Sequence, residues 1–211
     1  EEAAKELFAQ MERFAGYGFN KSHAVAYAVL AWRTAWLKVH HPEAFMAALC
    51  SHEIGDRETL ALYVGECRRL GIELLPSHVN DSMPLFAPAG VGGSKRAIRC
   101  GLAAVKNVGI GAAEEIVAER ANGPFVSLWD LLKRLDARKA NRRALEALIL
   151  VGAFDGFGAT RRGMIAALPK LWERASRVRA DADSDQINLF GESAPEGDPR
   201  IDPIEEFTDC G

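Results

Sequence analysis

The sequence predicts a mainly α-helical protein with one small β element and a disordered acidic tail. Three observations lead to this fold class. Apolar residues recur at helical spacing through most of residues 3–180. Two short strand candidates, 72–75 and 97–100, flank a loop rich in Gly, Pro, Ser and Asn and indicate a two- or three-stranded β element. From about residue 181 the composition turns to Asp, Ser, Gly and Pro, which favours disorder.

Four helices are expected before the first strand, packed together as one layer. The first covers residues 3–15, with its apolar side chains on one face, and ends at Gly16. The fourth ends at Gly71, a residue type that favours a helix C-terminus. The residues expected to begin the second, third and fourth helices are Ser22, Pro42 and Asp56.

The chain is expected to be helical again from Gly101, with a break at Gly109-Ile110-Gly111. Later helices have good N-caps, and the last contains Pro169, which costs about 3 kcal/mol unless the helix kinks or restarts there. The expected caps are Ser127, Asn141 and Thr160. These patterns predict three parts, namely a first helical domain over 1–100, a second helical region over 101–180, and a tail over 181–211.

Charge is unevenly distributed. The tail carries ten acidic residues and one basic residue, whereas the first 180 residues carry 25 basic and 19 acidic residues. A basic body is compatible with nucleic acid, and an acidic tail usually stays solvated or meets another protein. The run Lys133, Arg134, Arg138, Lys139, Arg142 and Arg143 is by itself no more than a candidate solvated face.

Bulk composition excludes several classes of protein. Hydrophobic content is 48%, and no apolar run approaches the roughly 20 residues that cross a bilayer, so no membrane association is expected. The four cysteines, Cys50, Cys67, Cys100 and Cys210, form no CxxC pair and favour free thiols in a reducing cytoplasm. The sequence starts within a helical pattern at residue 1 and finishes in a polar stretch, and both features predict a segment of a longer protein.

The first candidate site is Asn20-Lys21-Ser22-His23. A glycine-containing turn places these side chains on the first turn of a helix, where unpaired N–H groups and the helix dipole attract phosphate. An N-cap serine beside a solvated lysine and a packing histidine explains the same residues, and from the residues alone this simpler interpretation is favoured.

The second candidate site is Lys106-Asn107-Val108-Gly109-Ile110-Gly111. Two glycines around an apolar residue predict a tight hairpin, in which Ile110 anchors the hairpin to the core and the backbone amides approach a DNA phosphate. An ordinary C-cap glycine and turn fit about as well.

The third is Gln186-Ile187-Asn188-Leu189-Phe190, an apolar island in the acidic tail. It fits a linear motif in which Leu189 and Phe190 fill a hydrophobic cleft on a partner protein. A chance cluster of apolar residues is the alternative.

The five histidines form no metal-ligand pattern, and neither a P-loop nor a dinucleotide fingerprint occurs. No catalytic residue and no cofactor site is therefore expected in this chain.

One stretch, Tyr17-Gly18-Phe19-Asn20-Lys21-Ser22-His23-Ala24, closely resembles the fingers domain of bacterial DNA polymerase III alpha subunits, the C-family replicative polymerases. The resemblance continues through His41-Pro42-Glu43, Val105 to Gly109, Asn141-Arg142-Arg143 and Gly152-Ala153-Phe154-Asp155, and so covers most of residues 10–160.

The resemblance implies a role for each candidate site. Residues 20–23 would lie near the triphosphate of the incoming dNTP, and residues 105–111 would be a helix-hairpin-helix that grips template-primer DNA. Residues 186–190 would bind the β sliding clamp, within an assembly that includes the other polymerase III holoenzyme subunits. The catalytic aspartates, with their Mg²⁺, would lie upstream, so the fragment alone is expected to be inactive.

Three alternatives stay open. An error-prone C-family polymerase usually varies the Asn-Lys-Ser-His stretch and lacks the clamp peptide, so the intact motifs favour the replicative form. A helical protein-interaction module without any DNA role is the second alternative. A small-molecule enzyme is disfavoured because no catalytic constellation is present.

Overall fold

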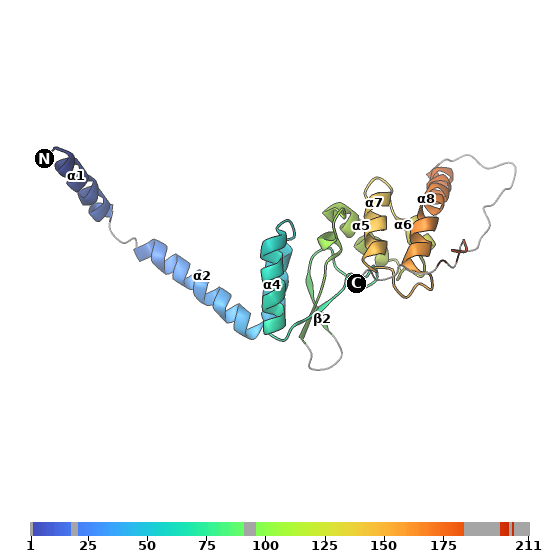
Figure 1. Ribbon diagram of the computed structural model, residues 1–211, viewed down its shortest axis with the longest axis horizontal. Helices are drawn as coiled ribbons and strands as arrows, with labels where there is room; N and C mark the ends of the chain where they lie inside the picture. Colours follow the sequence, from blue (N-terminus) through green and yellow to red (C-terminus); the bar gives the residue numbers. More distant parts are fainter. Residues whose placement is uncertain (1, 18–20, 91–95, 184–198, 203, 205–211) are drawn as a thin grey trace.

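In the computed structural model, residues 2–17, 21–90, 96–183, 199–202 and 204 are described. Within these residues the chain forms eight α-helices, one 3₁₀ helix and one three-stranded sheet, which confirms the expected fold class. Figure 1 shows an elongated arrangement in which the two N-terminal helices extend as an arm from a body that holds the sheet and the other helices.

The arm consists of α1 (Glu2–Tyr17) and α2 (Lys21–His40). Its large apolar side chains are exposed, among them Phe14 at 83% and Trp32 at 66% of their surface. The last turns of α2 contact the body, where the Trp36 and His41 rings stand 5.5 Å apart and Lys38 pairs with Glu66 at 2.7 Å. The expected single layer of four helices is therefore wrong, because among the described residues most of the apolar surface of α1 and α2 is left exposed.

The first core of the body lies between α3 (Pro42–His52), α4 (Arg57–Arg69) and the sheet. Asp56 caps α4 by accepting hydrogen bonds from the backbone of Glu58 and Thr59, as expected. Gly71, at φ 68°, ends it in the left-handed conformation that favours glycine. The fully buried members of this core are Met46, Ala47, Cys50, Cys67, Ile72 and Ile98.

The sheet has the order β1-β3-β2, with β1 (Glu73–Leu75) parallel and β2 (Ala87–Gly90) antiparallel to β3 (Arg96–Arg99). Strands β1 and β3 confirm the expected pair to within one residue. Strand β2 lies in the stretch between them and makes the expected two- or three-stranded element three-stranded. Pro88 lacks a backbone N–H and so disfavours a central strand, but β2 is an edge strand, where proline is tolerated.

The second core is formed by η1 (Leu102–Ala104), α5 (Ile110–Arg120), α6 (Leu128–Arg134), α7 (Arg142–Leu150) and α8 (Arg161–Asp183). Helix α8 packs along both α6 and α7. The expected caps are confirmed, since the side chains of Ser127, Asn141 and Thr160 accept from the N–H groups of Asp130, Ala144 and Gly163. The helix expected from Gly101 is reduced to the single turn of η1, because the chain then folds into a turn over Val105–Val108.

Pro169 lies inside α8, which nevertheless continues to Asp183. A proline at this position removes one backbone hydrogen bond. Burial of one helix face offsets that cost, and the side chains on this face are Met164, Leu168, Leu171 and Ala175.

Candidate nucleic-acid interface

The tip of the expected hairpin is a tight turn between η1 and α5. The N–H of Val108 donates to the carbonyl of Val105 at 3.0 Å, and Asn107 adopts a φ of 72°. A positive φ at the third position of a turn suits glycine or asparagine, because few other side chains tolerate the left-handed region. Lys106 and Asn107, the two central residues of this turn, are exposed at the tip of the hairpin.

The second half of the hairpin is the N-terminus of α5. Gly109 is the N-cap residue, and its carbonyl accepts from the N–H groups of Ala112 and Ala113, both at 3.1 Å. The first N–H groups of an α-helix have no partner inside the helix, and the helix dipole adds partial positive charge there. Because Gly109, Ile110 and Gly111 are all exposed, this end of α5 is open to solvent.

The residue that anchors the hairpin is not the expected one. Ile110 is 48% exposed, whereas Val108 is only 6% exposed and packs in the second core. The reason is the phase of α5, because Ala112, Ala113 and Ile116 lie on its buried face. Ile110 points away from that face, so the expected role of Ile110 as the anchor is wrong.

Neither hairpin glycine is required by the packing of the protein. A Cβ atom added to Gly109 or Gly111 would meet no heavy atom within 4 Å. Gly109 has a φ of −72°, which any residue can adopt. The two glycines thus leave the backbone amides accessible to a group from outside the chain.

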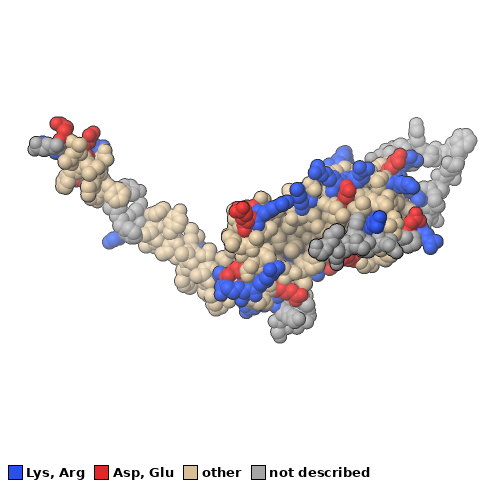
Figure 2. All heavy atoms as spheres, in the orientation of Figure 1, with Lys and Arg blue, Asp and Glu red and all other residues tan. Residues whose placement is uncertain are grey.

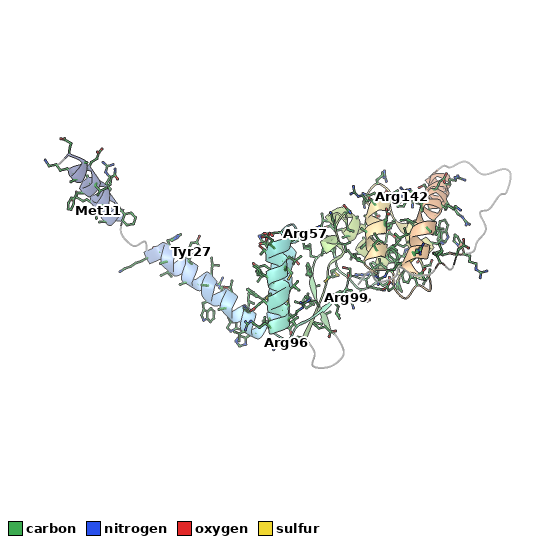
Figure 3. The ribbon with its side chains drawn as sticks, in the orientation of Figure 1. Met11, Tyr27, Arg57, Arg96, Arg99 and Arg142 are labelled. Atoms are coloured by element: carbon green, nitrogen blue, oxygen red, sulfur yellow. The ribbon has the colours of Figure 1, made fainter. Side chains whose placement is uncertain are left out.

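The basic run over residues 133–143 divides into structural and exposed side chains. Arg134 donates to the carbonyls of Glu119 and Gly123 and lies 4.4 Å from the Phe125 ring, so it holds the α5–α6 connection together. Lys139 pairs with the buried Glu115 at 2.6 Å, and this hydrogen bond raises the pKa of Lys139. Figure 2 shows Lys and Arg side chains along the upper edge of the body, and Figure 3 places Arg142 at that edge, on the first turn of α7.

The candidate phosphate site on α2 is only partly described, because Asn20 lies outside the described residues. Helix α2 begins at Lys21, so Ser22 lies inside its first turn and is not the N-cap. Lys21, Ser22 and His23 are all exposed, and the His23 ring lies 4.5 Å from that of Tyr27, which Figure 3 labels. Within the described residues the three side chains gather at one helix end, and α2 has no buried residue around them.

The candidate linear motif, residues 186–190, lies outside the described residues. Helix α8 extends to Asp183, so the expected boundary of the tail at about residue 181 lies in its last turn. Beyond it, residues 199–202 and 204 are described, and the Thr160 hydroxyl donates to the carbonyl of Ile204 at 2.7 Å.

One supporting residue has no signal in the sequence. Arg120, at the end of α5, donates to the carbonyls of Val79 and Ser82 at 3.2 and 2.9 Å. It thereby joins α5 to the loop after β1, about 40 residues away along the chain. Charge alone does not distinguish such an arginine from a solvated one.

The described part of the chain shows neither a metal-ligand cluster nor a membrane-spanning helix. No group of three His, Cys, Asp or Glu side chains in it is placed to hold a metal ion. None of its helices is long and apolar enough to cross a membrane.

Comparison with known proteins places the hairpin in context. Residues 71–164 match the helix-hairpin-helix motif family. The chain is 44% identical to the DNA polymerase III subunit alpha of Thermus aquaticus over 209 residues, which is 99% of this chain and 17% of that protein. The corresponding proteins of Xylella fastidiosa and Neisseria meningitidis serogroup B are 41% and 42% identical over 94% and 90% of this chain, and 16% of each relative is covered. The expected resemblance is confirmed, and the chain spans about a sixth of the length of these relatives.

Proposed function

We propose that this chain, similar over nearly its whole length to DNA polymerase III alpha subunits, is the segment of a replicative polymerase that grips duplex DNA behind the active site. Two further contacts belong to the same proposal, one with the incoming dNTP and one with the β sliding clamp. The whole protein would carry out DNA-templated DNA synthesis in the cytoplasm, together with the other holoenzyme subunits.

The exposed hairpin is the observation that carries the DNA-binding part of the proposal. Gly109 and Gly111 leave open space over the N-terminus of α5, and Lys106 stands beside it on the turn. Backbone N–H groups in this arrangement bind a phosphate oxygen without reading a base, and the lysine adds one charge. Such contacts suit a polymerase, which must hold duplexes of any sequence.

The DNA-binding test is a salt titration of duplex affinity for the whole chain. The double variant Lys106→Glu/Gly109→Val places a negative charge and a branched side chain at the hairpin, so we expect affinity to fall at least tenfold and the salt dependence to weaken by about one released counterion. Lys5→Glu, an exposed lysine on α1, is the matched control for net charge. Equal affinity of the double variant and this control would reject the hairpin as the DNA-binding element and favour the protein-interaction module.

The nucleotide contact rests on the exposed first turn of α2. Its N–H groups, Lys21, Ser22 and His23 supply charge-assisted donors of the kind that bind a triphosphate, and Asn20 precedes them in sequence. The test needs the complete polymerase. Lys21→Ala is expected to raise the KM for dNTP several-fold while duplex affinity stays within twofold, and an unchanged KM would contradict the assignment.

The clamp contact rests on Gln186, Ile187, Asn188, Leu189 and Phe190. The test is calorimetry of this chain with purified β clamp. Micromolar binding that Leu189→Ala/Phe190→Ala abolishes, and that Ser193→Ala leaves unchanged, would support the tether. Absence of binding by the wild-type chain would instead favour the error-prone C-family relative.

The chain by itself is not expected to extend a primer. The family resemblance assigns the catalytic aspartates and their Mg²⁺ to a preceding part of the polymerase, and the described residues offer no three-ligand metal group. We therefore assign no chemical step to these residues. Primer extension by the purified chain would overturn this part of the proposal.

A further inference from the structure

A buried acid on α5 holds the connection between α6 and α7 beside the hairpin helix. Glu115 is only 8% exposed, and its carboxylate accepts from the Nζ of Lys139 at 2.6 Å and from the backbone N–H of Asp136 at 3.3 Å. Ala140, the residue after Lys139, is fully buried in the second core. The connection is therefore fixed against α5 by an ion pair, a hydrogen bond and an apolar contact.

This attachment places the start of α7 close to the hairpin. Glu115 lies four residues after Gly111, so the two share one face of α5 and are about 6 Å apart along its axis. Arg142 follows Lys139 by three residues, a span of at most about 11 Å. The hairpin and the first turn of α7 thus lie within one turn of a DNA duplex, which is about 34 Å long.

The first turn of α7 presents two arginines that the fold does not use. Arg142 and Arg143 are exposed, and neither side chain forms an ion pair or hydrogen bond with another described residue. Glu146 lies one turn further along α7, yet among the described residues it pairs with neither arginine. The neighbouring Arg138, by contrast, pairs with Asp136 at 3.0 Å. In the described structure two guanidinium groups are thus open to a phosphate from outside the chain.

We propose that Arg142 and Arg143 form a second phosphate-binding element, which contacts the same duplex as the hairpin. The inference rests on the proposed function, because it extends the DNA contact of residues 106–111 past α5 to α7. Guanidinium groups bind phosphate oxygens through paired N–H donors, whereas the hairpin offers backbone amides and Lys106. Figure 3 places Arg142 at the upper edge of the body, where Figure 2 shows Lys and Arg side chains. Neither element reads a base, so the combined surface holds DNA of any sequence.

The test measures how the affinity of the whole chain for a duplex of about 12 base pairs, roughly one helical turn, depends on salt. Each phosphate contact contributes about 0.9 to the slope of log affinity against log salt concentration. Arg142→Ala/Arg143→Ala should therefore lower the slope by about two and weaken binding at least about tenfold, with the melting temperature unchanged. Arg13→Ala/Arg33→Ala is the matched control, because it removes the same charge from exposed positions on the arm, and it should leave the slope nearly unchanged.

The hairpin variant Lys106→Glu/Gly109→Val separates failure of this inference from failure of the proposed function. If the hairpin variant weakens binding while Arg142→Ala/Arg143→Ala behaves like the arm control, the hairpin binds DNA alone and the second element is rejected. If both variants behave like the control, the proposed DNA contact fails as well. Binding of two duplexes per chain, measured by analytical ultracentrifugation, would also overturn the inference, because a shared duplex requires a ratio of one to one.

Discussion

Asn80 and Phe125 exchange two hydrogen bonds. The Asn80 side-chain amide donates to the Phe125 carbonyl, and the Phe125 N–H donates to the Asn80 side-chain oxygen, both at 2.8 Å. Asn80 lies in the loop that leaves the sheet, and Phe125 lies between α5 and α6 with 2% of its surface exposed. This pair, with Arg120 beside it, fixes the first part of the body against the helices that carry the hairpin.

Asn80→Ala is expected to lower the free energy of unfolding by about 2–4 kcal/mol. The substitution removes two hydrogen bonds and leaves a donor and an acceptor of Phe125 unpaired, and each unpaired buried group costs about 1–3 kcal/mol. Urea unfolding followed by circular dichroism measures the change. Asn122→Ala is the control, since Asn122 is exposed and its side-chain amide donates to the Glu119 carboxylate at 3.3 Å. Similar losses in the two variants would contradict the locking role of Asn80.

Gly101→Ala tests the closest approach of two backbone segments in the body. A Cβ atom at residue 101 would lie 2.4 Å from the carbonyl carbon of Leu85, a distance that requires the backbone to move. Overpacking of this kind typically costs about 1–3 kcal/mol. The free energy of unfolding should therefore fall in Gly101→Ala and stay nearly unchanged in Gly55→Ala, where no atom lies within 4 Å. A neutral Gly101→Ala would show that the two segments separate easily.

Features set by neighbouring residues could be predicted from the sequence, and features set by distant packing could not. Asp56, Ser127, Asn141 and Thr160 were recognised as caps because a cap depends on the next three residues. The exposure of Ile110 is not encoded locally, because its direction depends on which face of α5 the core buries. The Asn80–Phe125 pair and the Thr160–Ile204 hydrogen bond join residues about 45 apart in sequence, and no local pattern encodes such contacts.

Buried thiols predict how stability falls at high pH. Burial first, and then the neighbouring thiol of Cys67, raise the pKa of Cys50 from 9.0 to about 12. The thiol thus stays protonated in the folded chain and ionises in the unfolded one, so its contribution is intact below about pH 9 and is lost as pH rises toward 12. Urea unfolding from pH 8 to 10.5 should show a decline in the free energy of unfolding, to which Cys50 contributes at most about 1.4 kcal/mol per pH unit. Cys50→Ala should reduce this decline. Equal slopes in the two proteins would contradict the assignment.

The apolar arm predicts self-association of the isolated chain. Helix α2 carries apolar side chains on all sides, a pattern typical of helices enclosed by a larger structure, and here they face solvent. Light scattering at tens of micromolar protein is expected to show dimers or larger species, and Trp32→Glu should shift them toward monomer. Leu62→Glu, at a single exposed position on α4, should not change the distribution. A monomeric wild-type chain would contradict this expectation.

Gly111→Ala should have opposite effects on stability and on DNA binding. Gly111 lies in the first turn of α5, where no atom would meet an added Cβ, and alanine is the better helix former by up to about 1 kcal/mol. The same methyl group would stand between the backbone amides and a bound phosphate, so duplex affinity should fall several-fold while thermal stability rises slightly. Gly65→Ala, in the middle of α4, provides the comparison, since it should stabilise the fold and leave duplex affinity unchanged. If Gly111→Ala binds duplex as tightly as Gly65→Ala, the phosphate does not approach this turn of α5, and the contact must be sought at Lys106 and the turn before it.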